Sequence, residues 1–450
     1  MLPSLQSGRA HEKSNATPDP REIYRQLLAQ PEDLSVRDAA RIFLQACLEQ
    51  ADSQATGFPA EACDWDEWAR LSARRCADGY QQYREGRAAG EARRYFQCRA
   101  HALHFLRGVS PTKLVDGAWL YGLVRQCEDP RLRLLIHTYL EELGEGAAAH
   151  NHVRLYRQLL GHNGCEPLPE LPREAYVQGA IQLALGHLAE EFLPEVIGFN
   201  LSYEQPPLHV LITAHELDEL GIDPWYFRLH VTIDNAASGH AHQALMAMRA
   251  NQPTSGSDRV WHRRLNRGAA LGDLGPGSVE VIKSFDLDGE VLRLLEAKRA
   301  FGMNMHADRC QIEGRTVNAW LAEPDGCASF LSALQRTGWI ERHRLPEQSR
   351  FWQLICGERA AMFGVFDAYE RQVLHDWIAG DVKMPAPARQ HIPAPLVDSE
   401  AERRLDEGWS QRLSTGSAQG RSELLRAMAP HRHWLAQGLS ATRVFARYLA

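Results

Sequence analysis

Carboxylate and imidazole side chains lie close together in one glycine-containing stretch in the first half of the chain. Residues 141–146 read Glu-Glu-Leu-Gly-Glu-Gly, and His150 and His152 follow shortly after. Helical bundles build iron sites from such groups when they project inward from several helices. Two glycines within a helical stretch cost about 1 kcal/mol each relative to alanine, so they imply close packing or a local distortion. Taken alone, the stretch is better explained as a solvated acidic helix face with surface histidines.

A second pair of ligand-type residues lies in an apolar segment. His230 and Asp234 are spaced i and i+4, so their side chains point the same way from one helix turn. Burying a charge without a partner is expensive, and a metal ion would supply that partner. A hydrogen-bonded Asp–His pair in a core explains the spacing equally well.

Two further histidines, His240 and His242, follow this pair. On an ideal helix, at about 100° per residue, His242 lies about 80° round from Asp234 and His240 about 120° round. Periodicity therefore favours His242 slightly, whereas His240 needs a widened turn, which Gly239 would permit. The residues themselves leave this choice open.

Single carboxylates complete the set of candidates. Glu204 ends an apolar, glycine-containing run that also holds Glu195, so its carboxylate could turn inward. A loop glutamate is the simpler interpretation of that position. Asp116 precedes Gly117, and it could equally cap the helix that follows.

Helical periodicity predicts the elements that must position these residues. Apolar residues recur at helical spacing over residues 21–50, and good helix formers fill residues 65–106. Further helices are expected over residues 129–160, 173–192 and 223–250. Strand signals are almost absent before residue 250, and Pro-containing turns separate the helices. We therefore predict a mainly α protein built on a bundle of about seven helices, with ligand sites between facing helices.

Changes in composition along the sequence predict that the chain is divided into four segments. Residues 1–19 are polar and rich in Pro and Ser, as in a disordered N-terminus, and residues 20–250 form the bundle. Residues 251–278 are rich in Gly, Ser, Asn and Arg, as in a linker or exposed loop. Residues 279–450 form an extension of mixed or helical structure, with unknown fold and role. Within it, residues 292–301, 367–378 and 401–449 look helical, while residues 279–282 and 316–320 could be strands.

The composition argues against several classes of partner. The net charge of −7 gives no electrostatic reason to expect nucleic acid. No apolar run approaches the ~20 residues of a membrane helix, and we expect no signal peptide, because residues 1–19 hold no apolar stretch that could serve as one. Nine cysteines without a CxxC pair fit mostly buried, reduced thiols in a cytoplasmic protein.

The order of these residues resembles the haem-oxygenase-like di-iron oxidases and oxygenases, a family also described as iron-containing redox enzymes. The resemblance rests on Glu-x-Gly-x-Gly-x5-His, a later lone Glu, then His-x3-Asp and a final His, and it covers roughly residues 20–250. It implies seven iron ligands: Asp116, Glu142, His152, Glu204, His230, Asp234 and His240. Asp116 stands where the family usually has Glu, and the usual position of the last histidine is here Ala237.

The resemblance also implies how the ligands divide between two irons. One iron would be held by Glu142, His152 and His240, and the other by Asp116, Glu204, His230 and Asp234. Glu142 would bridge the irons in some states, and Glu142 and Asp234 would take part in catalysis.

The activity that follows from the resemblance is an O2-dependent oxidation. Two Fe(II) ions per chain would use O2 to oxidise an amino-acid-like or acyl small molecule, as in natural-product biosynthesis, with electrons from a separate donor. N-oxygenation, desaturation and oxidative C–C cleavage all stay open, because fold and metal do not fix the substrate. The alternative is a helical binding or scaffold protein that keeps the fold without productive iron chemistry. A homodimer is compatible with either function.

Overall fold

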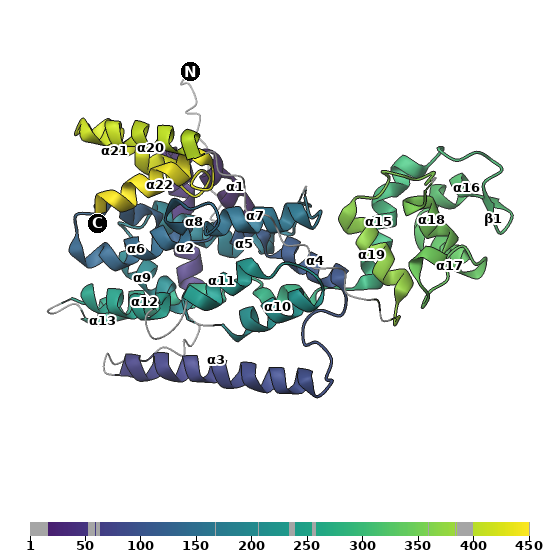
Figure 1. Ribbon diagram of the computed structural model, residues 1–450, viewed down its shortest axis with the longest axis horizontal. Coiled ribbons are helices and arrows are strands. Elements are labelled where there is room, and N and C mark those ends of the chain that lie inside the picture. The colour runs from purple at the N-terminus through teal and green to yellow at the C-terminus, as the bar shows by residue number, and fades with distance from the viewer. Residues whose placement is uncertain are drawn as a thin grey trace, which may run out of the picture.

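The protein is mainly helical. The computed structural model describes residues 17–52, 59, 64–166, 168–205, 207–233, 239–253, 258–358, 360–382, 384 and 399–449, without the side chains of 231–233 and 258. Helices dominate this described part (Figure 1). Its only strands are β1 (Gln311–Ile312) and β2 (Arg315–Thr316), which form a short antiparallel hairpin. The predicted mainly α fold class is confirmed.

The helix α8 (Val177–His187) lies at the centre of the bundle. Every residue from Gln178 to His187 is buried, as expected of a helix that is covered on all sides. Its most extensive packing is with α1 (Pro20–Ala29), α2 (Leu34–Ala51) and the 3-10 helix η2 (Ala118–Gln126). A Cβ at Gly186 would collide with the carbonyl of Ala118, so glycine permits the close approach of α8 and η2.

Four of the helical stretches expected from periodicity are broken. Residues 21–50 contain α1 and α2, and residues 65–106 contain α3 (Trp65–Ala88) and most of α4 (Arg99–Gly108). Residues 129–160 contain η3 (Pro130–Leu132), α6 (Arg133–Glu142), η4 (Gly144–Gly146) and α7 (His152–His162). Residues 223–250 contain α11 (Trp225–Ile233) and α12 (His240–Ala250). The break between α6 and α7 has a clear cause, because Gly144, Glu145 and Gly146 all have positive φ angles, and such a run cannot continue a right-handed helix.

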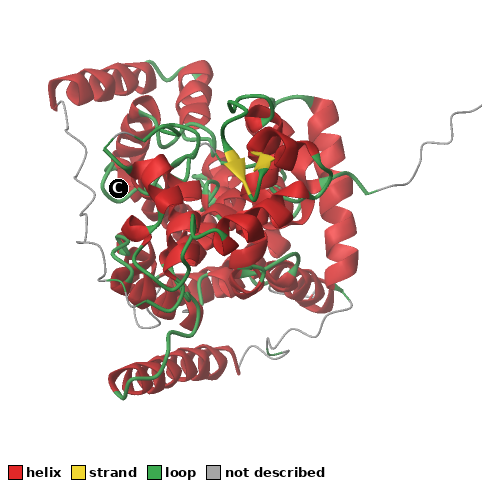
Figure 2. Cartoon of the chain, turned by 90° about the vertical axis from the view of Figure 1, so that its right-hand side faces the viewer, coloured by secondary structure: helices red, strands yellow, loops and turns green. Residues whose placement is uncertain are grey.

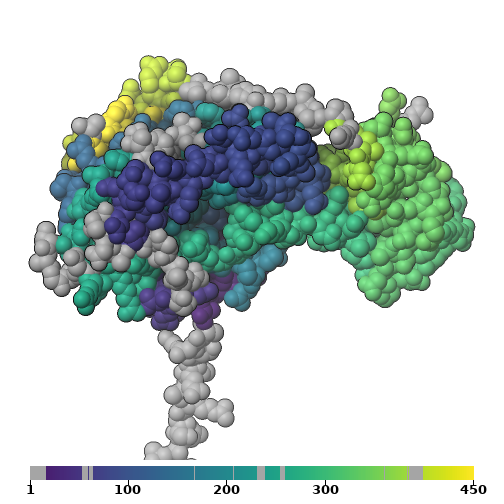
Figure 3. All heavy atoms as spheres, turned by 90° about the horizontal axis from the view of Figure 1, so that it is seen from below, coloured from purple at the N-terminus to yellow at the C-terminus, as the bar shows by residue number. Residues whose placement is uncertain are grey.

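The remaining helices of the bundle surround this core. They are α3 (Trp65–Ala88), α4 (Arg99–Gly108), α5 (Ser110–Lys113), η5 (Arg173–Tyr176), α9 (Leu193–Tyr203), α10 (Leu208–Glu219), η6 (Leu271–Asp273) and α14 (Ser278–Lys283). In Figure 3, α3 lies across the surface of the bundle as a long, dark blue rod. Among the described helices, none combines the length and the apolar character needed to cross a membrane.

The segment expected to be a linker contains a packed helix, α13 (Asp258–Ala270). Trp261, Leu265 and Ala269 recur every four residues and are buried, so a narrow apolar stripe lies within a polar composition. The helix packs closely on α9, where an added Cβ at Gly198 would collide with the Leu265 carbonyl. The prediction of a linker or loop over 251–278 is therefore wrong for this helix, because composition alone hides a narrow stripe.

The C-terminal extension divides into two parts with different positions. Its first part, residues 287–379, forms a satellite domain that stands beside the bundle near α4 (Figure 1). In Figure 2 the view is along this direction, and the yellow strands of its hairpin lie in front of the bundle. The helices of the satellite domain are α15 (Leu287–Gly302), α16 (Val317–Ala322), α17 (Gly326–Arg336), η7 (Pro346–Gln348), α18 (Arg350–Cys356) and α19 (Ala368–Ala379). Its second part comprises α20 (Ser399–Ser414), α21 (Ala418–Ala427) and α22 (Ala436–Leu449), which pack back on the bundle.

The first segment proposed as a strand in this extension is helical, and the second is helical apart from Thr316, which belongs to β2. Residues 279–282 lie in α14, where Val281 packs so closely on α4 that a Cβ at Gly108 would collide with it. Residues 317–320 lie in α16, which begins after Thr316 because the threonine hydroxyl accepts a hydrogen bond from the Ala319 amide. A tertiary contact and a helix cap thus override a short β-branched pattern.

Candidate metal centre

The structure brings six of the seven predicted ligands together in two adjoining groups. The first ligand group comprises Asp116, Glu142, His152 and His230, and the second comprises Glu142, Glu204 and His240. In each group, one potential ligand atom per residue lies within 4.8 Å of all the others. Asp234, the seventh predicted ligand, lies outside the described residues.

The first ligand group is compact, and all of its residues except the partly exposed His230 are buried. His152 Nδ1 lies 2.6 Å from Glu142 Oε2 and 4.0 Å from Asp116 Oδ2. His230 Nε2 lies 3.1 Å from the same Asp116 oxygen. Ligands of one metal ion sit about 3 Å apart, because metal–ligand bonds are about 2 Å long, so this spacing suits coordination.

The second ligand group shares Glu142 with the first. His240 Nδ1 lies 3.2 Å from Glu204 Oε2 and 3.5 Å from Glu142 Oε1. The two carboxylate oxygens of Glu142 therefore face different groups, with Oε2 toward His152 and Oε1 toward His240. A carboxylate in this position can bridge two cations.

This grouping differs from the one that the family resemblance implies. His152 lies with Asp116 and His230 instead of with His240, and Glu204 lies with His240 instead of with Asp116. The difference arises from the turn between α6 and α7, which brings the start of α7 toward the Asp116 loop. Sequence order could not reveal it, because it depends on which helix ends meet.

A glycine turn positions Glu142 and His152 opposite each other. Gly144 has φ +63°, and an added Cβ would lie 2.5 Å from the Asn151 amide nitrogen. The chain therefore folds tightly from the end of α6 to the start of α7. Asn151 then caps α7 by accepting a hydrogen bond of 3.0 Å from the Arg154 amide, and His152 is the first residue of that helix.

Asp116 turns into the first ligand group instead of capping the helix that follows. Gly117 has φ +79°, and a Cβ there would lie 2.8 Å from Glu142 Cβ, so glycine lets the loop pack on that residue. Asp116 Oδ2 accepts a hydrogen bond of 2.6 Å from Tyr226 Oη. Asp116 Oδ1 is buried and has no hydrogen-bond partner in the described part of the protein. A bound cation would satisfy this oxygen.

Electrostatics favour an ionised Asp116. Burial opposes ionisation, but the Lys113 ammonium, whose Nζ lies 3.9 Å from Oδ2, and the His230 ring outweigh it. The pKa of Asp116 therefore lies well below its usual range. Burial likewise opposes the charge on Lys113, yet the Asp116 carboxylate holds the pKa of that ammonium above its usual value. An ionised carboxylate is the form that binds a cation.

Two of the histidines are oriented by a second partner on the ring nitrogen that faces away from the group. His230 Nδ1 lies 2.8 Å from the carbonyl oxygen of Tyr226, which leaves Nε2 directed at Asp116. His240 Nε2 lies 3.0 Å from Glu141 Oε2, which leaves Nδ1 directed at Glu142 and Glu204. Metal-binding histidines are commonly fixed in this way by a carbonyl or a carboxylate.

The C-terminal helices support the turn that joins the two ligand-bearing helices. Asn151 Nδ2 donates hydrogen bonds to Leu143 O at 3.1 Å and to His433 Nδ1 at 3.0 Å. Arg443 Nη1 in α22 donates a hydrogen bond of 2.7 Å to Gly146 O. Residues far along the sequence thus hold both ends of the turn.

The other candidate residues have surface or structural positions. His150 and His242 are exposed, and Glu195 forms an ion pair with Arg264 at 2.6 Å. His240, the first residue of α12, is buried. The periodicity that favoured His242 does not apply, because the chain is not one helix from α11 to α12. Sequence reasoning missed Lys113, Glu141, Asn151, Tyr226 and His433, although Glu141 adjoins a predicted ligand.

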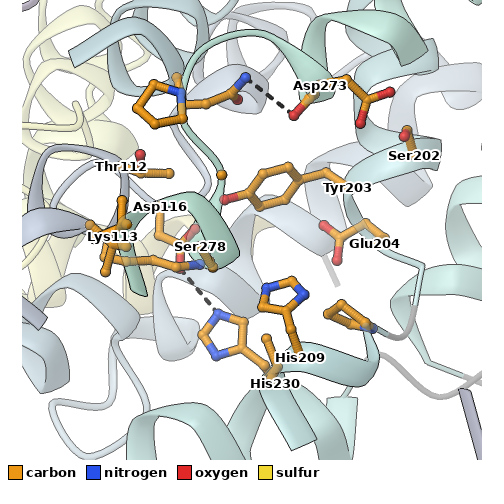
Figure 4. Close-up of a pocket in the computed structure, with 18 of the residues that line it drawn as sticks. Thr112, Lys113, Asp116, Ser202, Tyr203, Glu204, His209, His230, Asp273 and Ser278 are labelled. Carbon is orange, nitrogen blue, oxygen red and sulfur yellow. Dashed lines mark hydrogen bonds and ion pairs between the residues drawn. The ribbon is translucent and has the colours of Figure 1, made fainter. Parts of the chain in front are cut away.

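A cavity of about 260 Å³ adjoins both ligand groups (Figure 4). Its lining includes Asp116, Glu142, Glu204 and His230 from those groups. In Figure 4, His230 and Glu204 lie across the cavity from Asp273. The ligand groups therefore have direct access to a space that can hold a small molecule.

Residues 103–272 match the model of a known family. That family is the iron-containing redox enzymes of the haem-oxygenase-like type. The match confirms the resemblance drawn from the sequence, and it indicates an oxidoreductase. No curated protein and no solved structure matches the chain.

The residues present fit iron. Three buried carboxylates and three histidines form the two described ligand groups, and such hard oxygen and imidazole donors suit Fe(II). All six lie within the matched segment, whereas the C-terminal helices that support the α6–α7 turn lie outside it.

Proposed function

We propose that this protein is a non-haem di-iron oxidase or oxygenase that uses O2 to oxidise a small molecule. The observation that carries this proposal is Glu142, whose two carboxylate oxygens face two different groups of carboxylate and histidine side chains. One metal ion would need only one such group of ligands, so the presence of two groups favours two ions. The family match supports iron as the metal.

The side chains have distinct roles in this proposal. Asp116, His152 and His230 would hold one Fe(II), Glu204 and His240 would hold the other, and Glu142 would bridge them. Asp234 remains a predicted seventh ligand. Bound iron would supply the electrons that activate O2 and then the oxidation of the substrate.

The protein supplies geometry and exclusion of water. Tyr226 and Lys113 fix Asp116, while Glu141 and the Tyr226 carbonyl fix His240 and His230. The ligand groups lie at one side of the cavity and are largely buried, which would shield bound metal from bulk solvent.

The substrate in this proposal is an amino-acid-like or acyl small molecule, in the context of natural-product biosynthesis. Electrons would come from a separate donor. We further propose a cytoplasmic protein that acts without a nucleic-acid or membrane partner, in agreement with its net charge of −7, and that forms a homodimer.

Anaerobic titration of metal-free protein with Fe(II) tests the proposal. We expect about two iron ions per chain, followed by a transient visible absorbance band when O2 is added in a stopped-flow instrument. Absence of specific iron uptake would contradict the proposal and favour the helical binding or scaffold function. Uptake of a single iron would contradict the bridging role of Glu142.

A further inference from the structure

The ammonium of Lys113, a largely buried residue, lines the cavity, and its nearest carboxylate among the described residues is not within hydrogen-bond length. Lys113 Nζ lies 3.9 Å from Asp116 Oδ2, beyond hydrogen-bond length, and no carboxylate in the described part of the chain is closer. That oxygen already interacts with Tyr226 Oη at 2.6 Å and His230 Nε2 at 3.1 Å. The ammonium also interacts with the hydroxyl of Tyr203, and it lies 5.6 and 5.8 Å from the ring centres of Tyr203 and Tyr226. Lys113 can therefore attract an anionic group from a molecule in the cavity.

A fixed amide oxygen lines the same cavity. Gln178 Nε2 donates hydrogen bonds to the carbonyl oxygens of Leu271 and Leu274, at 2.7 and 2.6 Å. Because the amide nitrogen must face these carbonyls, the orientation of the side chain is determined. Gln178 is 8% exposed, and its Oε1 has no hydrogen-bond partner among the described residues. This oxygen can only accept, so it calls for an N–H or O–H donor.

The two groups lie in chemically different parts of the cavity. Lys113 adjoins Asp116 and hence the first ligand group. The Gln178 amide is hydrogen-bonded to backbone carbonyls of residues 271–274, and Asp273 in this segment places an exposed carboxylate on the cavity wall. Figure 4 shows Lys113 and Asp116 together, with Asp273 on another side of the cavity. The part of the cavity near Lys113 therefore carries a positive charge. The part near Gln178 and Asp273 presents oxygen atoms of these two side chains, which accept hydrogen bonds.

We propose that the cavity binds a small zwitterion, with its carboxylate on Lys113 and its amine directed to Gln178 and Asp273. A volume of about 260 Å³ is at the small end for ligand pockets, which suits an amino acid better than a large acyl carrier conjugate. The role of this zwitterion as substrate rests on the proposed function; its binding does not. The orientation would place the carboxylate end beside the ligand groups, and it favours desaturation or oxidative C–C cleavage near that end over N-oxygenation.

A panel of three ligand types tests this inference. We would titrate short linear ω-amino acids into metal-free and Fe(II)-loaded protein under anaerobic conditions, by isothermal titration calorimetry. Matched carboxylic acids lacking the amine, and matched amines lacking the carboxylate, would be titrated in parallel. At one chain length, we expect the amino acid to bind about tenfold or more tightly than either matched compound, because each end makes a charge-assisted hydrogen bond. Equal binding of all three would overturn the inference.

Two variants assign the two ends separately. Lys113→Met should weaken binding of the amino acid and the carboxylic acid about tenfold or more and leave the amine unaffected. Gln178→Leu should weaken binding of the amino acid and the amine and leave the carboxylic acid unaffected. Lys283→Met, at an exposed lysine on α14, is the matched control and should change none of them.

The metal-free titrations separate this inference from the proposed function. A panel that discriminates as expected supports the zwitterion site even if the iron titration fails. A carboxylic acid that binds Lys113→Met as tightly as the unmodified protein overturns the assignment of Lys113, whatever the iron content.

Discussion

The two ligand groups of the metal centre differ in how firmly the rest of the protein holds them. In the first group, Asp116 and His152 are each 1% exposed and His230 is 13% exposed, and the turn that carries His152 is tied to His433 in the loop before α22. In the second group, His240 is buried, but its supporting partner Glu141 is 28% exposed and Glu141 in turn contacts His137, which is 52% exposed. The ligands of the second group are all buried, so the groups differ in their supporting residues: Asn151 and His433 are buried, whereas Glu141 and His137 are not, and a buried, connected support favours a preorganised site. We therefore expect the first group to bind iron more tightly than the second.

The largest loss of iron binding is expected on substitution of Glu142, the residue that the two ligand groups share. Glu142→Ala removes an oxygen ligand from both groups, so iron content should fall from about two ions per chain to well below one. Iron analysis after anaerobic reconstitution and desalting measures this change. Glu145→Asn is the control, since Glu145 is exposed and asparagine tolerates its positive φ of 50°. Two tightly held irons in Glu142→Ala would contradict the shared-ligand geometry.

Removal of one histidine from each group should separate two binding steps. Competition between the protein and a colorimetric Fe(II) chelator should show affinities that differ about tenfold or more in the unmodified protein. His230→Ala should remove the tighter step and His240→Ala the weaker one. His242→Ala, at the exposed neighbour of His240, should leave both steps intact. If each histidine variant lost both steps equally, the two groups would form a single cooperative site.

The support of the second group by Glu141 is testable by itself. Glu141→Ala should weaken the second step about 10- to 100-fold and leave the first step unchanged, because the carboxylate fixes His240 through Nε2. Burial raises the pKa of Glu141, but hydrogen bonds from His137 and His240 lower it to about 2, so the carboxylate is ionised at neutral pH. Glu141→Gln keeps an acceptor oxygen and should restore part of the affinity. The same chelator competition measures both variants.

A smaller change in stability and iron affinity is expected on substitution of His433, which supports the first group from the C-terminal region. His433→Leu leaves an Asn151 N–H without its acceptor, so the free energy of unfolding should fall by about 1–3 kcal/mol. The first iron-binding step should weaken with it, by up to about tenfold. His433→Asn places an oxygen acceptor near the position of Nδ1 and should recover both properties. Chemical denaturation of metal-free protein and the chelator competition check them, with His431→Leu in the same loop as the control.

Much of this molecule could be predicted from residue types and spacing. The helical class followed from periodicity, and six of the seven proposed ligands lie in the two groups that the fold assembles. Gly144 and Gly146 signalled a distortion, which the structure shows to be a reversal of the chain. Composition failed at α13 and in the C-terminal extension, because a narrow apolar stripe or a tertiary contact is invisible to an average over many residues.

The sequence by itself determined which donors are present and that helices carry them. Only the tertiary structure decided that His240 enters the centre while His242 stays outside, because helical periodicity has no meaning across the break between α11 and α12. It also decided that Glu142 faces both groups and that His433 supports the turn, about 290 residues along the chain from Glu142. Such contacts depend on where helix ends meet in space, and no local pattern of residues encodes that position.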